Sequence, residues 1–202
     1  MGLGPWAPGT WGALLAVVLF SSVLHRLGLP LYMLCVLAVT GAGIWASGVV
    51  EDYFGKHDDG RIVIDEVAGQ LISLLPIVPL HGLALGSLPL PPALAVGPAQ
   101  NGIDVWWLLV VTGFVAFRWF DIRKPGAVKW AEERFEGGRG VMADDLVAGL
   151  FGAVIVTLLA YVFVVSRLQE LVWNSGFLAW LAPSYGTGFV SWAGTWIGSW
   201  LA

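Results

Sequence analysis

The sequence predicts an all-α membrane protein, a multi-spanning helical bundle of about five spans with a Trp-rich C-terminal interfacial helix or sixth span. Two observations predict this class. Hydrophobic residues make up 57% of the chain and charged residues only 12%, whereas soluble domains carry about 25% charged residues. The chain also contains long uncharged runs, and a span needs roughly 20 apolar residues. The net charge of −4 indicates no nucleic-acid partner, and no pattern indicates an obligate protein partner.

Five uncharged runs define the predicted helices. In order, they are Trp11–Leu24, Leu31–Val50, Val67 to about Leu80, Val105–Phe117 and Leu146–Val165. The second and fifth are long enough to cross a bilayer outright, whereas the other three need help from their polar ends. Pro76 and Pro79 are expected to break or kink the third run, and Pro125 is expected to end the helix of the fourth.

The remaining segments are less apolar or less regular. The Pro- and Gly-rich segment 88–102 is expected to be an external loop. The N-terminus lacks the basic region of a signal peptide and is expected to be the mature start. Cys35, the single cysteine, is expected to be a small apolar core residue. Residues 1–170 are expected to form the membrane domain and residues 171–202 a C-terminal extension, where scattered Trp is typical of an interface.

Charged residues are concentrated in two segments, 51–66 and 118–145. These segments hold all Lys and Arg residues except Arg26 and Arg167, and all acids except Asp104 and Glu170. If each run crosses once, the two segments face the same side. The positive-inside rule makes that side the cytoplasm.

Two acidic motifs resemble each other. The sequences DEVAG (65–69) and DLVAG (145–149) each place an acid four residues before a glycine, and such positions share one helix face. Because glycines let helices approach closely, the motifs are expected to gather Asp65, Glu66, Asp144 and Asp145. Gathered carboxylates repel one another unless a divalent cation lies among them, and all-oxygen ligands favour Mg²⁺, Mn²⁺ or Ca²⁺. Helix-dipole compensation is the plainer alternative, but the two pairs together with Asp121 favour a metal site.

Cations follow the fourth run. Arg118 and Lys124 flank Asp121, and cations beside a carboxylate-bound metal are suited to a phosphate group. The outlying cations are better explained as a flank that contacts anionic lipid headgroups; they are Arg123, Lys129 and Arg134.

Weaker signals surround these motifs. Thr10 is expected to be a helix N-cap, whose free amides offer a phosphate site, although capping alone is the simpler interpretation. The glycines of 137–140 predict a flexible flap or a turn. His57 is suited to acid–base catalysis or phosphate contact, although a loop histidine is more often a surface residue. His25 and His81 fall on the opposite side and are poor candidates.

Four blocks together resemble bacterial phosphatidylglycerophosphatase A, the Mg²⁺-dependent lipid phosphatase of the inner membrane. They are GLGPWAPGTWG (2–12), HDDGRIVIDEVAG (57–69), FRWFDIRKPG (117–126) and GGRGVMADDLVAG (137–149). The resemblance implies an all-helical fold and a phosphomonoester on a membrane lipid, with phosphatidylglycerophosphate converted to phosphatidylglycerol. By motif position, it implies the functional residues His57, Asp58, Asp65, Glu66, Arg118, Asp121, Lys124, Asp144 and Asp145.

The expected mechanism is metal-assisted hydrolysis at the cytoplasmic surface. Mg²⁺ would be held by the four acids of the two motifs and by Asp121, with Asp65 and Asp145 also serving the reaction. Arg118, Lys124 and Thr10 would bind phosphate, while His57 or Asp58 would protonate the leaving oxygen. Direct nucleophilic attack by an acid is a second route. A divalent-cation transporter or channel is the alternative function, but it predicts acids in the middle of spans.

Overall fold

The computed structural model describes residues 8–54, 62–81, 87–88 and 103–174. The chain divides into two units, Met1–Ala160 and Tyr161–Ala202. The first unit contains the helix bundle and all the site residues discussed below. The described part of the second unit is the final stretch of one helix. The predicted loop at 88–102, except for its first residue, and the Trp-rich tail from residue 175 lie outside the described residues.

The described residues confirm the predicted all-α class. They form α1 (Pro8–Ser22), η1 (Leu24–Arg26), α2 (Leu29–Phe54), α3 (Ile64–Leu74), η2 (Leu75–Leu80), α4 (Val105–Arg123), α5 (Gly126–Arg134) and α6 (Gly138–Asn174), where η denotes a 3-10 helix. Within the described part of the chain, one antiparallel pair of two-residue strands, β1 (Ser87–Leu88) and β2 (Ile103–Asp104), precedes α4.

Three of the described helices are long and apolar enough to cross a membrane. They cover Leu29–Tyr53, Val105–Arg123 and Gly138–Val165. The predicted count of five spans is therefore not confirmed, because α1 and α3 are shorter. The fourth run reaches span length because its helix continues through the polar residues up to Arg123, for 19 residues in all.

Proline ends two helices where the sequence predicts. α3 stops at Leu74, and the chain continues as the 3-10 helix η2, which contains Pro76 and Pro79. Proline has no N–H group to continue an α-helical ladder. α4 ends at Arg123, two residues before Pro125, whose ring disfavours helical geometry in the residue that precedes it.

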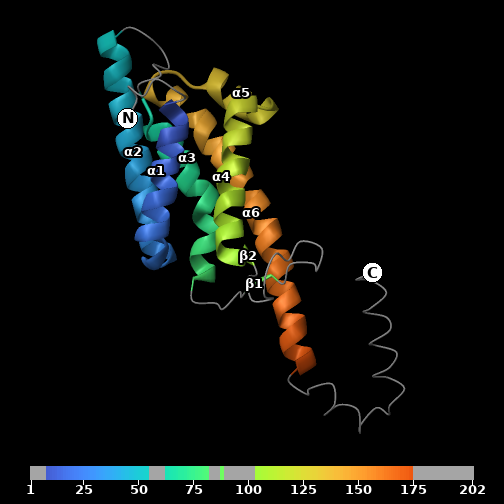
Figure 1. Ribbon diagram of the computed structural model, residues 1–202. Helices are drawn as coiled ribbons and strands as arrows, with labels where there is room; N and C mark the ends of the chain where they lie inside the picture. Colours follow the sequence, from blue (N-terminus) through green and yellow to red (C-terminus); the bar gives the residue numbers. More distant parts are fainter. Residues whose placement is uncertain (1–7, 55–61, 82–86, 89–102, 175–202) are drawn as a thin grey trace. The chain divides into compact units, whose positions relative to one another are not determined.

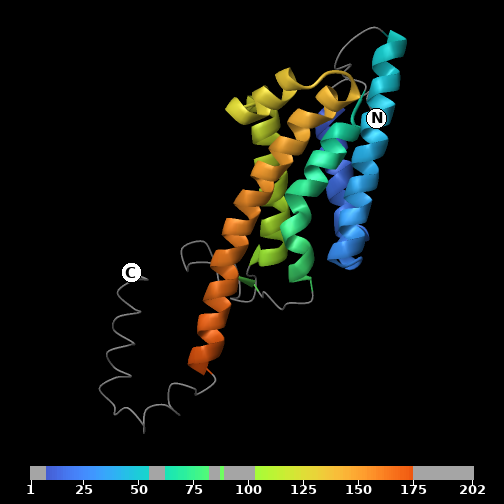
Figure 2. The same ribbon diagram turned by 180° about the vertical axis from the view of Figure 1, so that it is seen from behind.

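α3 lies at the centre of the bundle and is buried along most of its length. It packs against α1, α2 and α4, and both views show it among the longer helices (Figures 1 and 2). The Tyr32 hydroxyl of α2 donates a 2.6 Å hydrogen bond to the Leu71 carbonyl of α3. Ser73 of α3 donates a similar bond to the Gly113 carbonyl of α4, at 2.9 Å. These polar links tie the central helix to its neighbours where water is excluded.

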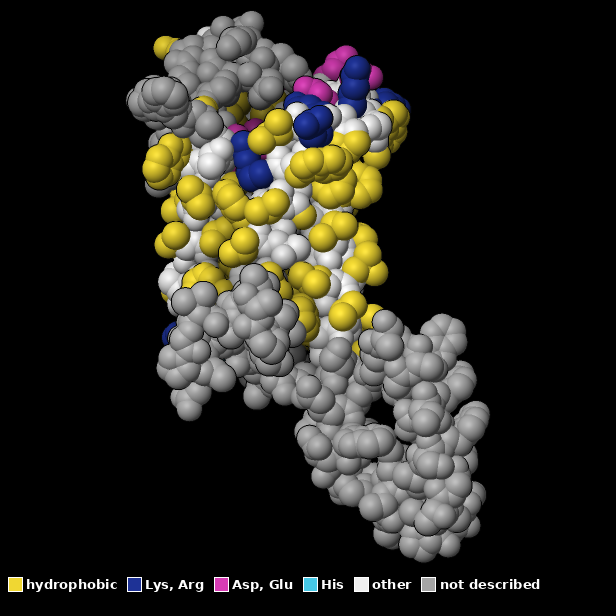
Figure 3. All heavy atoms as spheres, turned by 45° about the vertical axis from the view of Figure 1, so that its right-hand side comes forward, with side chains coloured by type: hydrophobic (Ala, Val, Ile, Leu, Met, Phe, Trp, Pro, Cys, Tyr) yellow, Lys and Arg dark blue, Asp and Glu magenta, His cyan; other side chains and the backbone are white. Residues whose placement is uncertain are grey.

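The outward faces of the long helices are apolar. Leu37 of α2, Val115 of α4 and Leu158 of α6 are each more than half exposed. Figure 3 shows hydrophobic side chains over the middle of the described surface, with Lys, Arg, Asp and Glu gathered towards its upper end. Exposed apolar surface of this extent indicates contact with lipid.

Candidate active site

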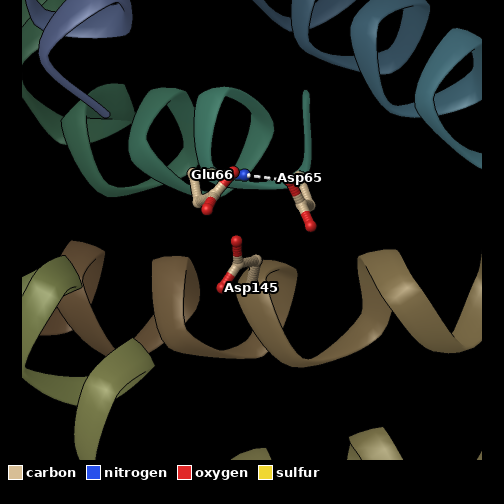
Figure 4. A group of neighbouring side chains, drawn as sticks. All are labelled: Asp65, Glu66 and Asp145. Carbon is tan, nitrogen blue, oxygen red and sulfur yellow. Dashed lines mark hydrogen bonds between the residues drawn. The ribbon is translucent and has the colours of Figure 1, made fainter. Parts of the chain in front are cut away.

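Three carboxylates from two helices meet at the polar end of the bundle. Asp65 and Glu66 lie in the first turn of α3, and Asp145 lies in the second turn of α6. One ligand oxygen from each lies within 4.8 Å of the others, and Figure 4 shows the three groups pointing toward one another. Asp65 and Asp145 are only 6% and 4% exposed. We call these three residues the carboxylate triad.

Two glycines make this meeting possible. Gly69 packs on the backbone of α6, because a methyl group at Gly69 would lie 2.5 Å from the Asp145 carbonyl oxygen. A methyl group at Gly149 would overlap the Gly69 carbonyl oxygen. The predicted approach of the two acid–glycine motifs is thus confirmed, since each glycine lies one turn beyond its acid and lets the backbones touch.

Glu66 lies among groups that oppose its negative charge. Burial raises the pKa of Glu66 to about 9, and the neighbouring Asp65 and Asp121 contribute to the rise. Its Oε2 atom has no hydrogen-bond partner among the described residues. A side chain at Gly9 of α1 would overlap Glu66 Oε1. These surroundings disfavour the ionised form of the Glu66 carboxyl group. A bound cation would stabilise that ionised form.

Arg118 connects α4 to α1. Its guanidinium forms an ion pair with Asp121, one turn later on the same helix, and both side chains are 15% exposed. Nη2 of Arg118 also donates a 3.4 Å hydrogen bond to Thr10 Oγ1. The prediction that Thr10 is an N-cap is wrong, because α1 already begins at Pro8 and Thr10 lies inside its first turn. Thr10 instead contacts the cation that was predicted to bind phosphate.

Lys124 forms a second polar centre beside the triad. Its Nζ atom lies 2.8 Å from Asp144 Oδ2 and 2.8 Å from Glu132 Oε1. Burial lowers the pKa of Lys124, but hydrogen bonds and charge attraction from these two acids outweigh that effect and raise it above the usual value. Asp144 is therefore paired with a cation, as Asp121 is. The prediction that these two residues bind metal stays a prediction.

Glu132 was not among the site residues predicted from the sequence. It lies on α5, a nine-residue helix that was not among the predicted elements. The available signal was the alternation of apolar and charged residues after Pro125, with Val128 and Ala131 buried. At the start of α6, the glycine segment forms a turn, in which Gly137 has φ +64° and its carbonyl accepts the Gly140 N–H at 2.8 Å. His57 and Asp58 lie outside the described residues.

The site residues are carried by sequence blocks that a known family shares. The sequence model of phosphatidylglycerophosphatase A matches residues 1–160, a range that contains the triad, both cations and all four motif blocks. The chain belongs to the phosphatidylglycerophosphatase A family. The predicted family and the predicted phosphatidylglycerophosphatase activity are thereby confirmed.

Individual relatives agree with this family. The chain is 32% identical to phosphatidylglycerophosphatase A of Escherichia coli over 152 residues, which cover 75% of this chain and 73% of the relative. It is 29% identical to the protein of that name in Haemophilus influenzae, over 77% of this chain and 80% of the relative. A third relative, from Bacteroides thetaiotaomicron, is 34% identical over 80% of this chain and 88% of its own length, and carries the provisional name phosphatidylinositol-3-phosphatase. No solved structure matches the chain significantly.

Proposed function

We propose that this phosphatidylglycerophosphatase works with Mg²⁺ held by Asp65, Glu66 and Asp145. The observation that carries the proposal is the carboxylate triad, in which three oxygens lie within 4.8 Å of one another in a largely buried place. Oxygen-only ligands suit a hard divalent cation. Two or more ionised carboxylates so close together would otherwise be strongly destabilised.

The charge of the whole site supports the same assignment. The acids outnumber the cations, because Arg118 and Lys124 stand against Asp65, Glu66, Asp121, Glu132, Asp144 and Asp145. A phosphate dianion would be repelled by such a site. A divalent cation changes that balance and, when bound, polarises phosphoryl oxygens and lowers the pKa of water.

The protein's own side chains, in addition to the metal ion, hold the substrate. Arg118 presents a guanidinium to the equatorial oxygens of the phosphoryl group, and Asp121 and Thr10 fix its orientation. Lys124 supplies the second positive charge. Stabilising these oxygens is the main demand of phosphoryl transfer. Proton donation to the leaving oxygen by His57 or Asp58 stays part of the proposal, as does attack by either water or a carboxylate.

We also propose that the site faces the cytoplasm and that the chain lies in the bacterial inner membrane. The Lys and Arg residues gather on the side of the triad, as the positive-inside rule requires. The proposed topology has five crossings, with α1 and the α3–η2 pair crossing beside the three long helices. A lipid headgroup phosphate would then meet the triad at the membrane surface.

The middles of the described spans argue against the alternative of a cation transporter. In α2, α4 and α6, every charged residue up to Val165 lies at the end near the triad. A conducting pathway with acidic binding sites needs such groups at depth. The arrangement instead matches an enzyme that acts at the interface.

A phosphate-release assay tests the proposal. Purified protein in detergent should release inorganic phosphate from phosphatidylglycerophosphate with Mg²⁺ and lose this activity in EDTA. Full activity in EDTA would exclude the metal role. A parallel assay with phosphatidylinositol 3-phosphate decides the substrate, since the name of the Bacteroides relative raises that lipid as the competing one. Faster hydrolysis of the inositol lipid would overturn the proposed substrate.

A further inference from the structure

Lys124 has an unusual backbone conformation. Its φ is +41°, and no other non-glycine residue of the described chain has a positive φ. Its N–H donates to the Phe120 carbonyl at 2.9 Å, which closes the last turn of α4. Glycine is the usual residue at such a left-handed helix end, because a side chain there is strained by about 1 kcal/mol or more. A lysine in this place indicates that its side chain is needed there.

The turn directs Lys124 toward the following helix as well as toward α6. α5 begins at Gly126 and places Val128 in the hydrophobic core. Glu132 lies four residues after Val128, so it shares the face that α5 turns to the bundle. From there its Oε1 atom reaches Lys124 Nζ at 2.8 Å.

The neighbouring acid on α5 behaves differently. Glu133 is 66% exposed and lies 3.7 Å from Lys129, which is equally exposed. Glu132 is 37% exposed, and its lysine partner also contacts Asp144. Two adjacent glutamates on one helix thus have different positions, one at the site and one on the surface.

We propose that Glu132 is a positioning residue that holds the Lys124 ammonium in place for the substrate phosphate. The inference rests on the proposed function, because it assigns phosphate binding to Lys124. With Glu132 present, the ammonium is shared between an acid of α5 and an acid of α6. Without Glu132, its nearest remaining charged partner is Asp144, and the flexible lysine stem is free to turn toward α6. Positive charge is then lost at the place where phosphate binds.

The test uses binding and turnover together in the full-length protein in detergent with Mg²⁺. Binding of inorganic phosphate is followed by ³¹P NMR, and KM and kcat are measured with phosphatidylglycerophosphate. Glu132→Gln should raise both the phosphate Kd and KM roughly fivefold, in keeping with a partly exposed ion pair, and leave kcat within about twofold. Glu133→Gln makes the same change of charge on the same helix. It should match the wild type in phosphate Kd, in KM and in kcat.

Two further variants exclude a general effect on folding. Glu132→Asp keeps the charge on a shorter side chain and should restore part of the phosphate affinity. In a Lys124→Met background, Glu132→Gln should add nothing, since residues that act through one another are not additive. The inference is overturned if Glu132→Gln binds phosphate like the wild type, or if its effect persists without Lys124. If the wild type bound inorganic phosphate but hydrolysed neither phosphatidylglycerophosphate nor phosphatidylinositol 3-phosphate, only the proposed function would be overturned.

Discussion

The carboxylate end of the bundle and the opposite end, where His25, His81 and Trp106 lie, are packed by different means. At the opposite end, large rings fill the space. The ring centroids of His25 and His81 are 4.7 Å apart, and those of His25 and Trp106 are 5.4 Å apart. His25 also has its Nδ1 atom 2.8 Å from the Phe20 carbonyl oxygen. At the aromatic end, His25 is therefore buried against neighbouring rings and contacts a backbone carbonyl.

The carboxylate end uses glycines in place of rings. Gly69, Gly149 and Gly9 bring backbones and carboxyl groups into contact, and the resulting charges are only partly balanced. Close packing around unbalanced charge lowers stability, as is expected where a site serves function. In this bundle, the end that is harder to stabilise is therefore the end for which the catalytic site is proposed.

The largest effect on phosphatase activity is expected from a substitution at the carboxylate end. Asp145→Asn should lower phosphate release by roughly a thousandfold, because it removes a ligand of the proposed cation from a buried site. The measurement is kcat/KM on phosphatidylglycerophosphate, with thermal unfolding as the control for folding. A folded Asp145→Asn variant with near-normal turnover would remove Asp145 from the site.

Glycine substitution should show how much stability depends on the close helix contact at the carboxylate end. Gly149→Ala should destabilise the protein by about 1–3 kcal/mol, because its methyl group meets the Gly69 backbone. At Gly41 of α2, an added methyl group would meet open space among the described residues. Gly41→Ala is therefore the matched control and should change stability by less than about 1 kcal/mol. Equal unfolding temperatures for the two variants in detergent would show that the helix contact is loose.

The triad should also make the metal-free protein sensitive to pH. A glutamate whose pKa is raised on folding favours the folded state fully below its unfolded pKa of about 4.3. That contribution is lost as the pH rises toward the folded value of about 9 given for Glu66. In EDTA, the unfolding temperature should therefore fall between about pH 6 and pH 9, and Glu66→Gln should reduce the fall by roughly 2–4 °C. A steeper fall in Glu66→Gln than in the wild type would show that Glu66 is not the group responsible.

The smallest effect is expected at the aromatic end. His25→Gln should leave kcat and KM unchanged, because His25 follows the end of α1 that lies away from the triad. Loss of its contact with the Phe20 carbonyl should lower stability by about 1 kcal/mol. A large loss of phosphatase activity in this variant, without unfolding, would contradict the assignment of the chemistry to one end.

The sequence predicted the parts of the fold that depend on long patterns. Apolar runs marked α1, α2, α4 and α6, and proline marked the ends of α3 and α4, because both signals act locally. The triad was predictable from the spacing of Asp65 to Gly69 and of Asp145 to Gly149. Helical geometry converts such a spacing directly into a shared face.

Other features depend on tertiary contacts that no local pattern reveals. α5 is too short and too polar to produce a membrane-scale signal, so Glu132 was missed. The left-handed turn at Lys124 pairs Asp144 with a cation, although the sequence places Asp144 next to Asp145. Thr10 was expected to cap α1 because a cap and a first-turn residue look alike when the helix start is uncertain by about two residues.

Binding of Mn²⁺ tests the central claim most directly, because it needs no assumption about the lipid. Electron paramagnetic resonance of the detergent-solubilised protein should show saturable Mn²⁺ binding that Mg²⁺ displaces. Asp145→Asn should lose this binding, whereas Glu133→Gln should keep it. Equal Mn²⁺ binding by the wild type and by a folded variant with all three triad carboxylates changed to amides would contradict the account.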